Sequence, residues 1–191
     1  MHRIVITVLL ILLPAISVSA GELKSGEFSP ARMAPDFKLP ASNGKELGLS
    51  DYRGKVVALV FGFTSCPHIC PVTMSDLAKV KKQLGDSGKN FQVVFVTVDP
   101  ERDNTEQLKN YLAHFDSSFV GVTGTSEQLV AVQKEYGAVA TNAKADKSGV
   151  GNIDHSTFVY LIDRAGKLRA LSPFGQLVDD LIPDVRVLLN Q

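Results

Sequence analysis

The two cysteines of this 191-residue chain, Cys66 and Cys70, lie in the stretch TSCPHICPVTM. Three residues separate them, one more than in the Cys-x-x-Cys motif of thiol–disulfide exchange. One turn of chain places their Cα atoms about 6 Å apart, so the pair can form a redox-active disulfide, bind one soft metal ion or make a structural bridge. The bridge is the weakest of these explanations, because so short a loop constrains the unfolded chain little.

The prolines after both cysteines indicate the local structure. A residue before a proline is pushed away from helical angles, so residues 66–70 are expected to form a turn. Pro71 suits the first position of a following helix. The positive N-terminal end of that helix would face both sulfurs and lower the pKa of the thiols. The resulting thiolates would serve a nucleophile and a metal ligand equally well.

His155 is the candidate third group, just before the apolar strand-like segment of NIDHSTFVYLI. If that strand runs antiparallel to the one before the cysteines, its beginning lies at the same sheet edge as the sulfurs. Two thiolates and one imidazole form a soft set that suits Cu(I), and one more ligand would accommodate Cu(II). Zinc is less favoured, because a structural zinc site takes four protein ligands.

The elements that position these residues follow from apolar patterns. Continuous apolar runs over 56–63 and 91–98 predict two strands buried on both faces. Helical spacing predicts helices after the cysteines, after Asn104 or Thr105, from Ser126 to Tyr136, and from Leu177 to Leu189 with a kink or restart at Pro183. Two strands, 157–162 and 167–172, are joined by a turn, and residues 141–152 are expected to form a loop or loose hairpin.

This order predicts an α/β protein with a thioredoxin-like fold: a mixed central sheet, helices on both faces, and an N-terminal hairpin extension around Asn43-Gly44. Thioredoxin-type enzymes place a cis-proline opposite their cysteines, and the DHST segment has no proline there. That difference counts against a general disulfide exchanger.

The N-terminus differs from the rest of the chain. Residues 1–20 combine a basic start, an apolar run and small residues ending at Ala20, which predicts a cleaved signal peptide and export to the periplasm or another extracytoplasmic space. A retained membrane anchor is the alternative, although the run is shorter than the roughly 20 residues of a membrane span. Residues 21–33 are expected to be a flexible leader, and residues 34–191 one domain. The 20 basic and 20 acidic side chains leave no basic surplus for nucleic acid.

Three segments in this order, FTSCPHICPVTM, VTVDPERD and DHSTFVYLID, resemble the SCO/SenC family of copper chaperones over about residues 30–190. The family delivers copper to the CuA site of cytochrome c oxidase. By this resemblance Cys66, Cys70 and His155 are the copper ligands, and Asp99 and Asp154 lie close to them. Members of the family are commonly tethered to a membrane, whereas this sequence predicts export and release.

Two functions therefore compete. The first is a metallochaperone that carries Cu(I), and in some states Cu(II), to an apo copper protein such as the oxidase CuA subunit. It would need a thiol reductase to keep Cys66 and Cys70 reduced outside the cytoplasm, and another copper carrier could load it. The second is a thiol–disulfide reductase acting on the cysteines of such a target. Three other side chains are given structural roles: His68 in an exposed turn, Met74 in the core, and His114 near a helix C-terminus.

Overall fold

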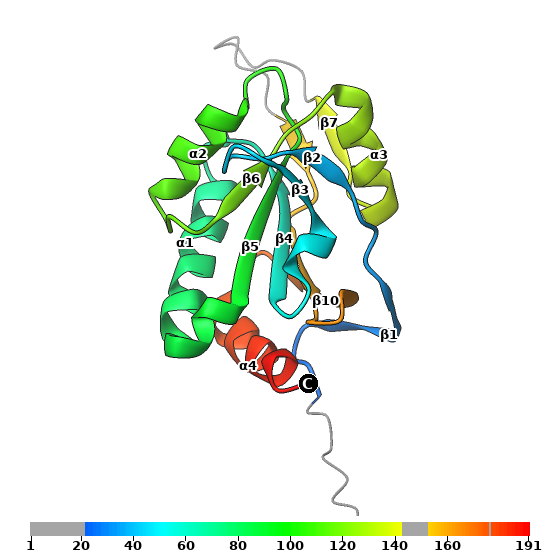
Figure 1. The fold of residues 1–191 in the computed structure, drawn as a ribbon, viewed down its shortest axis with the longest axis vertical. Helices are drawn as coiled ribbons and strands as arrows, with labels where there is room; N and C mark the ends of the chain where they lie inside the picture. Colours follow the sequence, from blue (N-terminus) through cyan, green and yellow to red (C-terminus); the bar gives the residue numbers. More distant parts are fainter. Residues whose placement is uncertain (1–21, 143–152, 176) are drawn as a thin grey trace, which may run out of the picture.

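A six-stranded mixed sheet forms the centre of the computed structural model (Figure 1). The structure describes residues 22–142, 153–175 and 177–191. The strand order is β1-β10-β9-β4-β5-β6. The strands are Gly26–Met33 (β1), Val56–Gly62 (β4), Phe91–Thr97 (β5), Val120–Val122 (β6), Phe158–Ile162 (β9) and Lys167–Pro173 (β10). β4, β5 and β6 are parallel and β9 runs antiparallel to β4, which confirms the predicted mixed sheet.

The two central strands are buried on both faces, as their continuous apolar sequences predict. Every residue of β4 and of β5 is buried. Successive side chains of a strand point to opposite faces, so Val60 joins the hydrophobic cluster on one face and Phe61 joins the cluster on the other.

Helices cover both faces of this sheet. They are Ile69–Gln83 (α1), Thr105–Ala113 (α2), Ser126–Tyr136 (α3) and Leu177–Leu189 (α4), with 3-10 turns at Leu49–Tyr52 (η1) and Gly85–Asn90 (η2). α1, α2 and α4 pack on one face, and α3 lies apart from them on the other (Figure 1). α4 runs as one helix through Pro183, so the restart considered at this proline is not observed.

Capping residues begin α2 and α3. The Asn104 side chain accepts a hydrogen bond of 2.8 Å from the Gln107 N–H, as expected of the cap before α2. Thr125 and Gln128 form a reciprocal capping box before α3.

The predicted N-terminal hairpin is present as a separate small sheet. Its strands, Lys38–Pro40 (β2) and Glu46–Gly48 (β3), pair antiparallel around a turn in which Gly44 has a φ of 80°. Leu39 and Leu47 bury against the same face of the central sheet as α3.

Residues 21–33 were expected to be a flexible leader, but Gly26–Met33 of this segment form strand β1. Its sequence, GEFSPARM, is largely exposed and has little apolar patterning, so local sequence gives no strand signal. The strand forms because β1 pairs antiparallel with β10 at the sheet edge. Tertiary pairing, rather than burial of a hydrophobic face, orders this segment.

Asp184 fastens the start of that segment to α4. It is fully buried and accepts hydrogen bonds from the backbone N–H groups of Lys24 (2.6 Å) and Ser25 (2.9 Å). We predict that Asp184→Asn lowers the free energy of unfolding by about 2 kcal/mol, since a bond to a charged acceptor contributes about 1.5–3 kcal/mol. Trypsin should then cleave faster at Lys24 and Arg32. The exposed Asp179 of the same helix provides the control Asp179→Asn, and equal proteolysis of both variants would contradict the prediction.

The segment predicted as a loop or loose hairpin is flanked by two short paired strands, Ala140–Asn142 (β7) and Ile153–His155 (β8). Residues 143–152 lie outside the described residues. β8 leads into β9 through Ser156, whose N–H donates to the Val139 carbonyl at 2.9 Å. This pairing joins the His155 backbone to the segment that follows α3.

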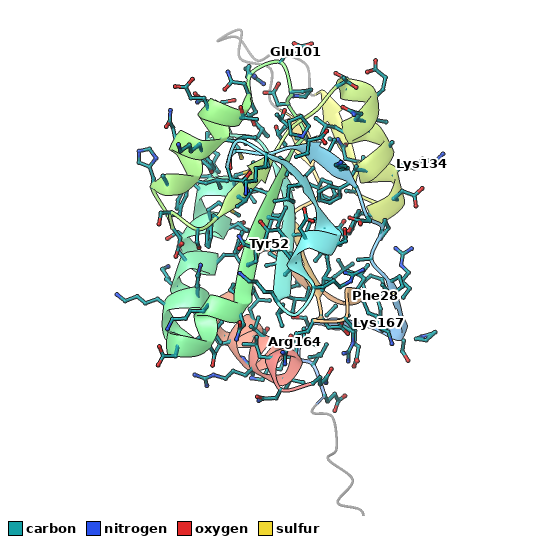
Figure 2. All side chains as sticks on the ribbon, viewed as in Figure 1. Phe28, Tyr52, Glu101, Lys134, Arg164 and Lys167 are labelled. Atoms are coloured by element: carbon teal, nitrogen blue, oxygen red, sulfur yellow. The ribbon has the colours of Figure 1, made fainter. Side chains whose placement is uncertain are left out.

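The two ends of the sheet are marked by labelled residues in Figure 2. Glu101, just after β5, lies at one end of the molecule, and Arg164, in the turn between β9 and β10, lies at the other. Because β4 and β5 are parallel, the segments that follow both strands emerge at the Glu101 end.

Candidate functional site

Cys66 and Cys70 lie where β4 gives way to α1. After Gly62 the chain makes a turn in which the Cys66 N–H donates to the Phe63 carbonyl at 3.2 Å. α1 begins at Ile69, slightly earlier than predicted, so Cys70 lies in its first turn. Cys70 is 1% exposed, whereas Cys66 is half-buried. Of the two sulfurs, Cys66 is therefore the one that a partner molecule reaches first.

The two thiols interact with each other. The hydrogen bond between their side chains, together with burial, raises the pKa of the Cys70 thiol above its usual range. The prediction that the helix N-terminus would lower the pKa is therefore wrong for Cys70. Ionising a buried sulfur next to a second sulfur costs free energy, and one hydrogen bond to the nearby Phe63 backbone does not offset that cost. A cation bound to both sulfurs would remove this cost.

Asp103 holds the loop in front of the cysteines, and the sequence analysis missed this residue. Its fully buried carboxylate accepts hydrogen bonds from the Thr64 N–H (2.9 Å), the Thr64 hydroxyl (2.6 Å) and the Thr97 hydroxyl (2.7 Å). Thr64 stands two residues before Cys66, and Thr97 ends β5. The carboxylate thereby ties the segment between β4 and α1, residues 63–68 (the cysteine loop), to the end of β5.

Asp99 lies at the same sheet end but is bound differently. It is 6% exposed, its carboxylate forms an ion pair with Arg102, and its N–H donates to the Thr97 hydroxyl at 3.0 Å. The sequence analysis had placed Asp99 near the sulfurs. Of the two aspartates in the DPERD segment, Asp103 is the one whose contacts to the cysteine loop are seen.

His155 and Asp154 are the last residues of β8, and their side chains lie outside the described residues. The His155 backbone pairs with Ala140 and stands three residues before the first residue of β9. β9 begins beside the end of β4, because Val159 pairs with Val60. The predicted antiparallel arrangement thus brings the His155 backbone to the sheet end from which the cysteines emerge.

The described side chains alone do not make a metal site. Among them, a set that omits Asp154 and His155, no group of three or more His, Cys, Asp or Glu side chains is arranged to hold a metal ion. His155, whose side chain is not among those described, remains the third ligand that the sequence predicts.

Comparison with known proteins identifies the family. The SCO1/SenC family model matches residues 26–190. The chain belongs to the SCO1/SenC family. A SCO2-like protein of Rickettsia felis is 34% identical over 137 residues, which cover 71% of this chain and 67% of the relative. The mitochondrial SCO2 homolog of Bos taurus is 36% identical over 133 residues, covering 69% of this chain but only 50% of that protein.

Solved structures of SCO proteins share the fold. ScoI of Bradyrhizobium japonicum with copper bound is 28% identical with a TM-score of 0.74, covering 82% of this chain and 99% of that one. Yeast Sco1 with copper bound is also 28% identical with a TM-score of 0.74, covering 84% and 90%. These neighbours confirm the thioredoxin-like fold expected of a SCO1/SenC protein.

His68, His114 and Met74 of this SCO1/SenC chain take the structural positions expected for them. His68 is exposed at the N-cap of α1, and His114 is exposed at the C-cap of α2. Met74 is fully buried in the core. None of the three gives a sign of a second ligand set.

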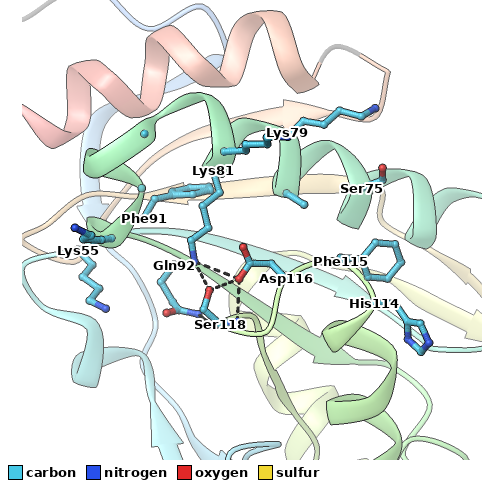
Figure 3. A pocket seen from close by; sticks show the side chains of 15 residues that line it. Lys55, Ser75, Lys79, Lys81, Phe91, Gln92, His114, Phe115, Asp116 and Ser118 are labelled. Atoms are coloured by element: carbon cyan, nitrogen blue, oxygen red, sulfur yellow. Dashed lines mark hydrogen bonds and ion pairs between the residues drawn. The ribbon is translucent and has the colours of Figure 1, made fainter.

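A cavity of about 790 Å³ lies elsewhere, between α1, η2 and the segment after α2 (Figure 3). Several lysines line it, but Lys81 contacts Asp116 and Ser118, and Lys79 pairs with Asp76 at 2.8 Å. Neither cysteine lines this cavity. Local ion pairs hold three of its lysines, Lys79, Lys81 and Lys89, and the cavity is separate from the sulfur pair of the SCO1/SenC site.

No helix in the described part of the chain combines the length and apolar character needed to cross a membrane.

Gly62 allows the close packing of Cys70 in this SCO1/SenC chain. A Cβ at Gly62 would lie 2.8 Å from Cys70 Sγ and 2.8 Å from the Phe95 ring. We predict that Gly62→Ala costs about 1–3 kcal/mol of stability through overpacking and also weakens Cu(I) binding by moving the sulfur.

Gly121→Ala is the matched control for this substitution. A Cβ there would meet Leu108 Cβ at the same distance, 2.8 Å, but no sulfur. It should cost similar stability in urea denaturation while leaving Cu(I) affinity unchanged. Equal affinities in the two variants would contradict the role assigned to Gly62.

Proposed function

We propose that this protein binds Cu(I) through Cys66, Cys70 and His155 and delivers it to an apo copper protein, with the CuA site of cytochrome c oxidase as the recipient. The observation that carries the proposal is the pair of contacting thiols at the entrance of α1, beside the strand that His155 precedes. Two sulfurs and one imidazole nitrogen suit Cu(I), which prefers soft ligands.

Known relatives support this proposal. The similar structures from Bradyrhizobium japonicum and yeast hold copper. A further structure with the same fold, BsSco, is described as a member of the Sco family of cytochrome c oxidase assembly proteins, although it is only 23% identical. Copper is cargo in this function, so the ligands must both hold the ion and release it.

Release follows from ligand exchange without electron transfer. Each thiol loses its proton when Cu(I) binds and regains one when the ion leaves. The half-exposed Cys66 is the natural point at which an acceptor sulfur or imidazole shares the ion, while the buried Cys70 holds it from behind. The acceptor then replaces the ligands one at a time.

Contact between the two thiols also supports the second function, reduction of the target's cysteines. The Cys66 thiolate would attack the target disulfide to form a mixed disulfide, and Cys70 would displace the target thiol. The target gains two electrons and two protons, while Cys66 and Cys70 become a disulfide that an external thiol reductase must reduce. The two functions use the same sulfurs but differ in their need for His155.

An apo CuA domain distinguishes them in two parallel reactions. Its reduced form is mixed with the Cu(I)-loaded protein, and its oxidised form is mixed with the reduced protein without copper. Delivery predicts copper transfer in the first reaction that is lost in His155→Ala. Delivery would be overturned in favour of reduction by two results together. These are fast disulfide reduction in the second reaction that survives His155→Ala, and no copper transfer in the first.

We also propose that residues 1–20 direct export and are removed, which would place the protein in the periplasm or an equivalent compartment. Oxidation of nearby thiols is favoured there, so a dedicated thiol reductase and an upstream copper carrier are expected partners. In the soluble extracytoplasmic fraction, an intact protein mass that corresponds to a chain beginning at Gly21 would support this. Retention of residues 1–20 in the membrane fraction would support an N-terminal anchor instead.

A further inference from the structure

The hydroxyl of Tyr111 in α2 is buried without a hydrogen-bond partner in the described part of the chain. A buried polar group without a partner costs free energy, so its retention calls for a reason. Leucine or phenylalanine would fill the same position in the core without that cost. The surroundings of the hydroxyl supply the reason.

The Tyr111 ring packs against the hydrophobic cluster that contains Cys70, beside the rings of Phe95 and Phe115. Its centroid is 5.9 Å from that of Phe95 and 5.2 Å from that of Phe115. The edge of the Phe95 ring and Cys70 Sγ approach Gly62 from the same side, since a Cβ there would meet both at 2.8 Å. Tyr111 and Cys66 also pack against the same hydrophobic cluster, which includes Cys70.

The geometry of α2 favours a Tyr111 hydroxyl directed toward the cysteine loop. Long side chains of a helix point back toward its N-terminus. The N-terminus of α2 follows Asp103, which holds Thr64 in front of Cys66. Consistent with this placement, burial raises the pKa of Tyr111, and the charges of Cys70, Cys66 and Asp103 raise it further.

We propose that Tyr111 is a positioning residue of the copper site, whose hydroxyl donates a hydrogen bond to the sulfur pair, directly or through one water molecule, when the sulfurs bind Cu(I). The inference rests on the proposed function. A thiol sulfur is a weak acceptor, whereas a thiolate bound to a cation keeps negative charge and accepts strongly. The hydroxyl thus lacks a partner in the dithiol form and gains one in the loaded form, which favours loading.

Tyr111→Phe tests this role, because it removes the hydroxyl and keeps the ring. Anaerobic competition with a Cu(I) chelator should show affinity about 10- to 100-fold lower, the usual effect of removing a hydrogen bond to a metal ligand. The copper-free reduced variant should be as stable as wild type or more stable in urea. The sulfur-to-copper absorption of the Cu(II) form should shift, which a change in stability alone would not cause.

Tyr136→Phe is the matched control, because its hydroxyl donates to the Pro35 carbonyl at 2.7 Å, in the opposite hydrophobic cluster. It should lower stability and leave Cu(I) affinity within about twofold. A Tyr111→Phe variant whose affinity and absorption match those of wild type would overturn the inference while the proposed function stands. Failure of the wild type itself to bind Cu(I) would instead overturn the proposed function.

Discussion

Replacing His155 by alanine is expected to weaken Cu(I) binding by more than about 100-fold. Removing a hydrogen-bond partner of a metal ligand costs 10- to 100-fold, so removing a ligand should cost more. Cys66→Ser and Cys70→Ser should lose still more, because a hydroxyl is a poor ligand for a soft cation. Anaerobic competition with a Cu(I) chelator measures each affinity, and wild type should bind one equivalent.

His68→Ala is the control for this series. His68 lies between the two cysteines in sequence, yet it is exposed at the N-cap of α1. If proximity in sequence determined the ligand, this variant would lose the affinity and His155→Ala would keep it. That outcome would show that the third ligand is misassigned.

Circular dichroism checks that Cys70→Ser, which buries a hydroxyl, remains folded.

Asp103→Asn is expected to lower the free energy of unfolding by about 3–5 kcal/mol. The carboxylate accepts three hydrogen bonds in a fully buried position, and each bond to a charged acceptor contributes about 1.5–3 kcal/mol. An amide presents an N–H₂ group toward one of these donors, which leaves a donor unpaired. Because Thr64 loses its anchor, Cu(I) affinity should fall about 10- to 100-fold in addition.

Two further variants locate this effect. Thr64→Val removes the hydroxyl and keeps the backbone N–H bond, so about one third of the stability loss is expected. Asp86→Asn changes a fully exposed carboxylate, and it should change the free energy of unfolding by less than about 0.5 kcal/mol. Urea denaturation measures all three. A loss below about 1 kcal/mol for Asp103→Asn would refute the tethering role.

The different contacts of Asp99 and Asp103 show why the sequence analysis did not find the carboxylate that holds the cysteine loop. The motif DPERD indicates that acidic groups follow a buried strand, and both aspartates satisfy that pattern. Both are buried, and which one reaches Thr64 depends on the turn after β5, where the Asp103 N–H donates to the Asp99 carbonyl at 2.9 Å. A fully buried carboxylate next to two threonines is recognisable only after folding.

Short and edge strands escaped prediction for a related reason. β6 has three residues, and β1 is a mostly exposed strand with a proline. Strands of this kind obtain their order from partners distant in the chain, β5 for one and β10 for the other. Their own sequences carry little periodic burial, the signal on which sequence-based prediction relies.

The sequence by itself determined the central strands β4 and β5, helices α1 to α3 with the cap of α2, the sulfur pair, and the family. These features depend on local spacing: continuous apolar runs, helical periods, capping side chains, and two cysteines within one turn. Only the tertiary structure decided which sulfur is buried, which aspartate holds the loop, and how the thiol pKa shifts. The reason is that burial and hydrogen bonding are properties of neighbours brought together from far along the chain, such as Thr64, Thr97 and Asp103.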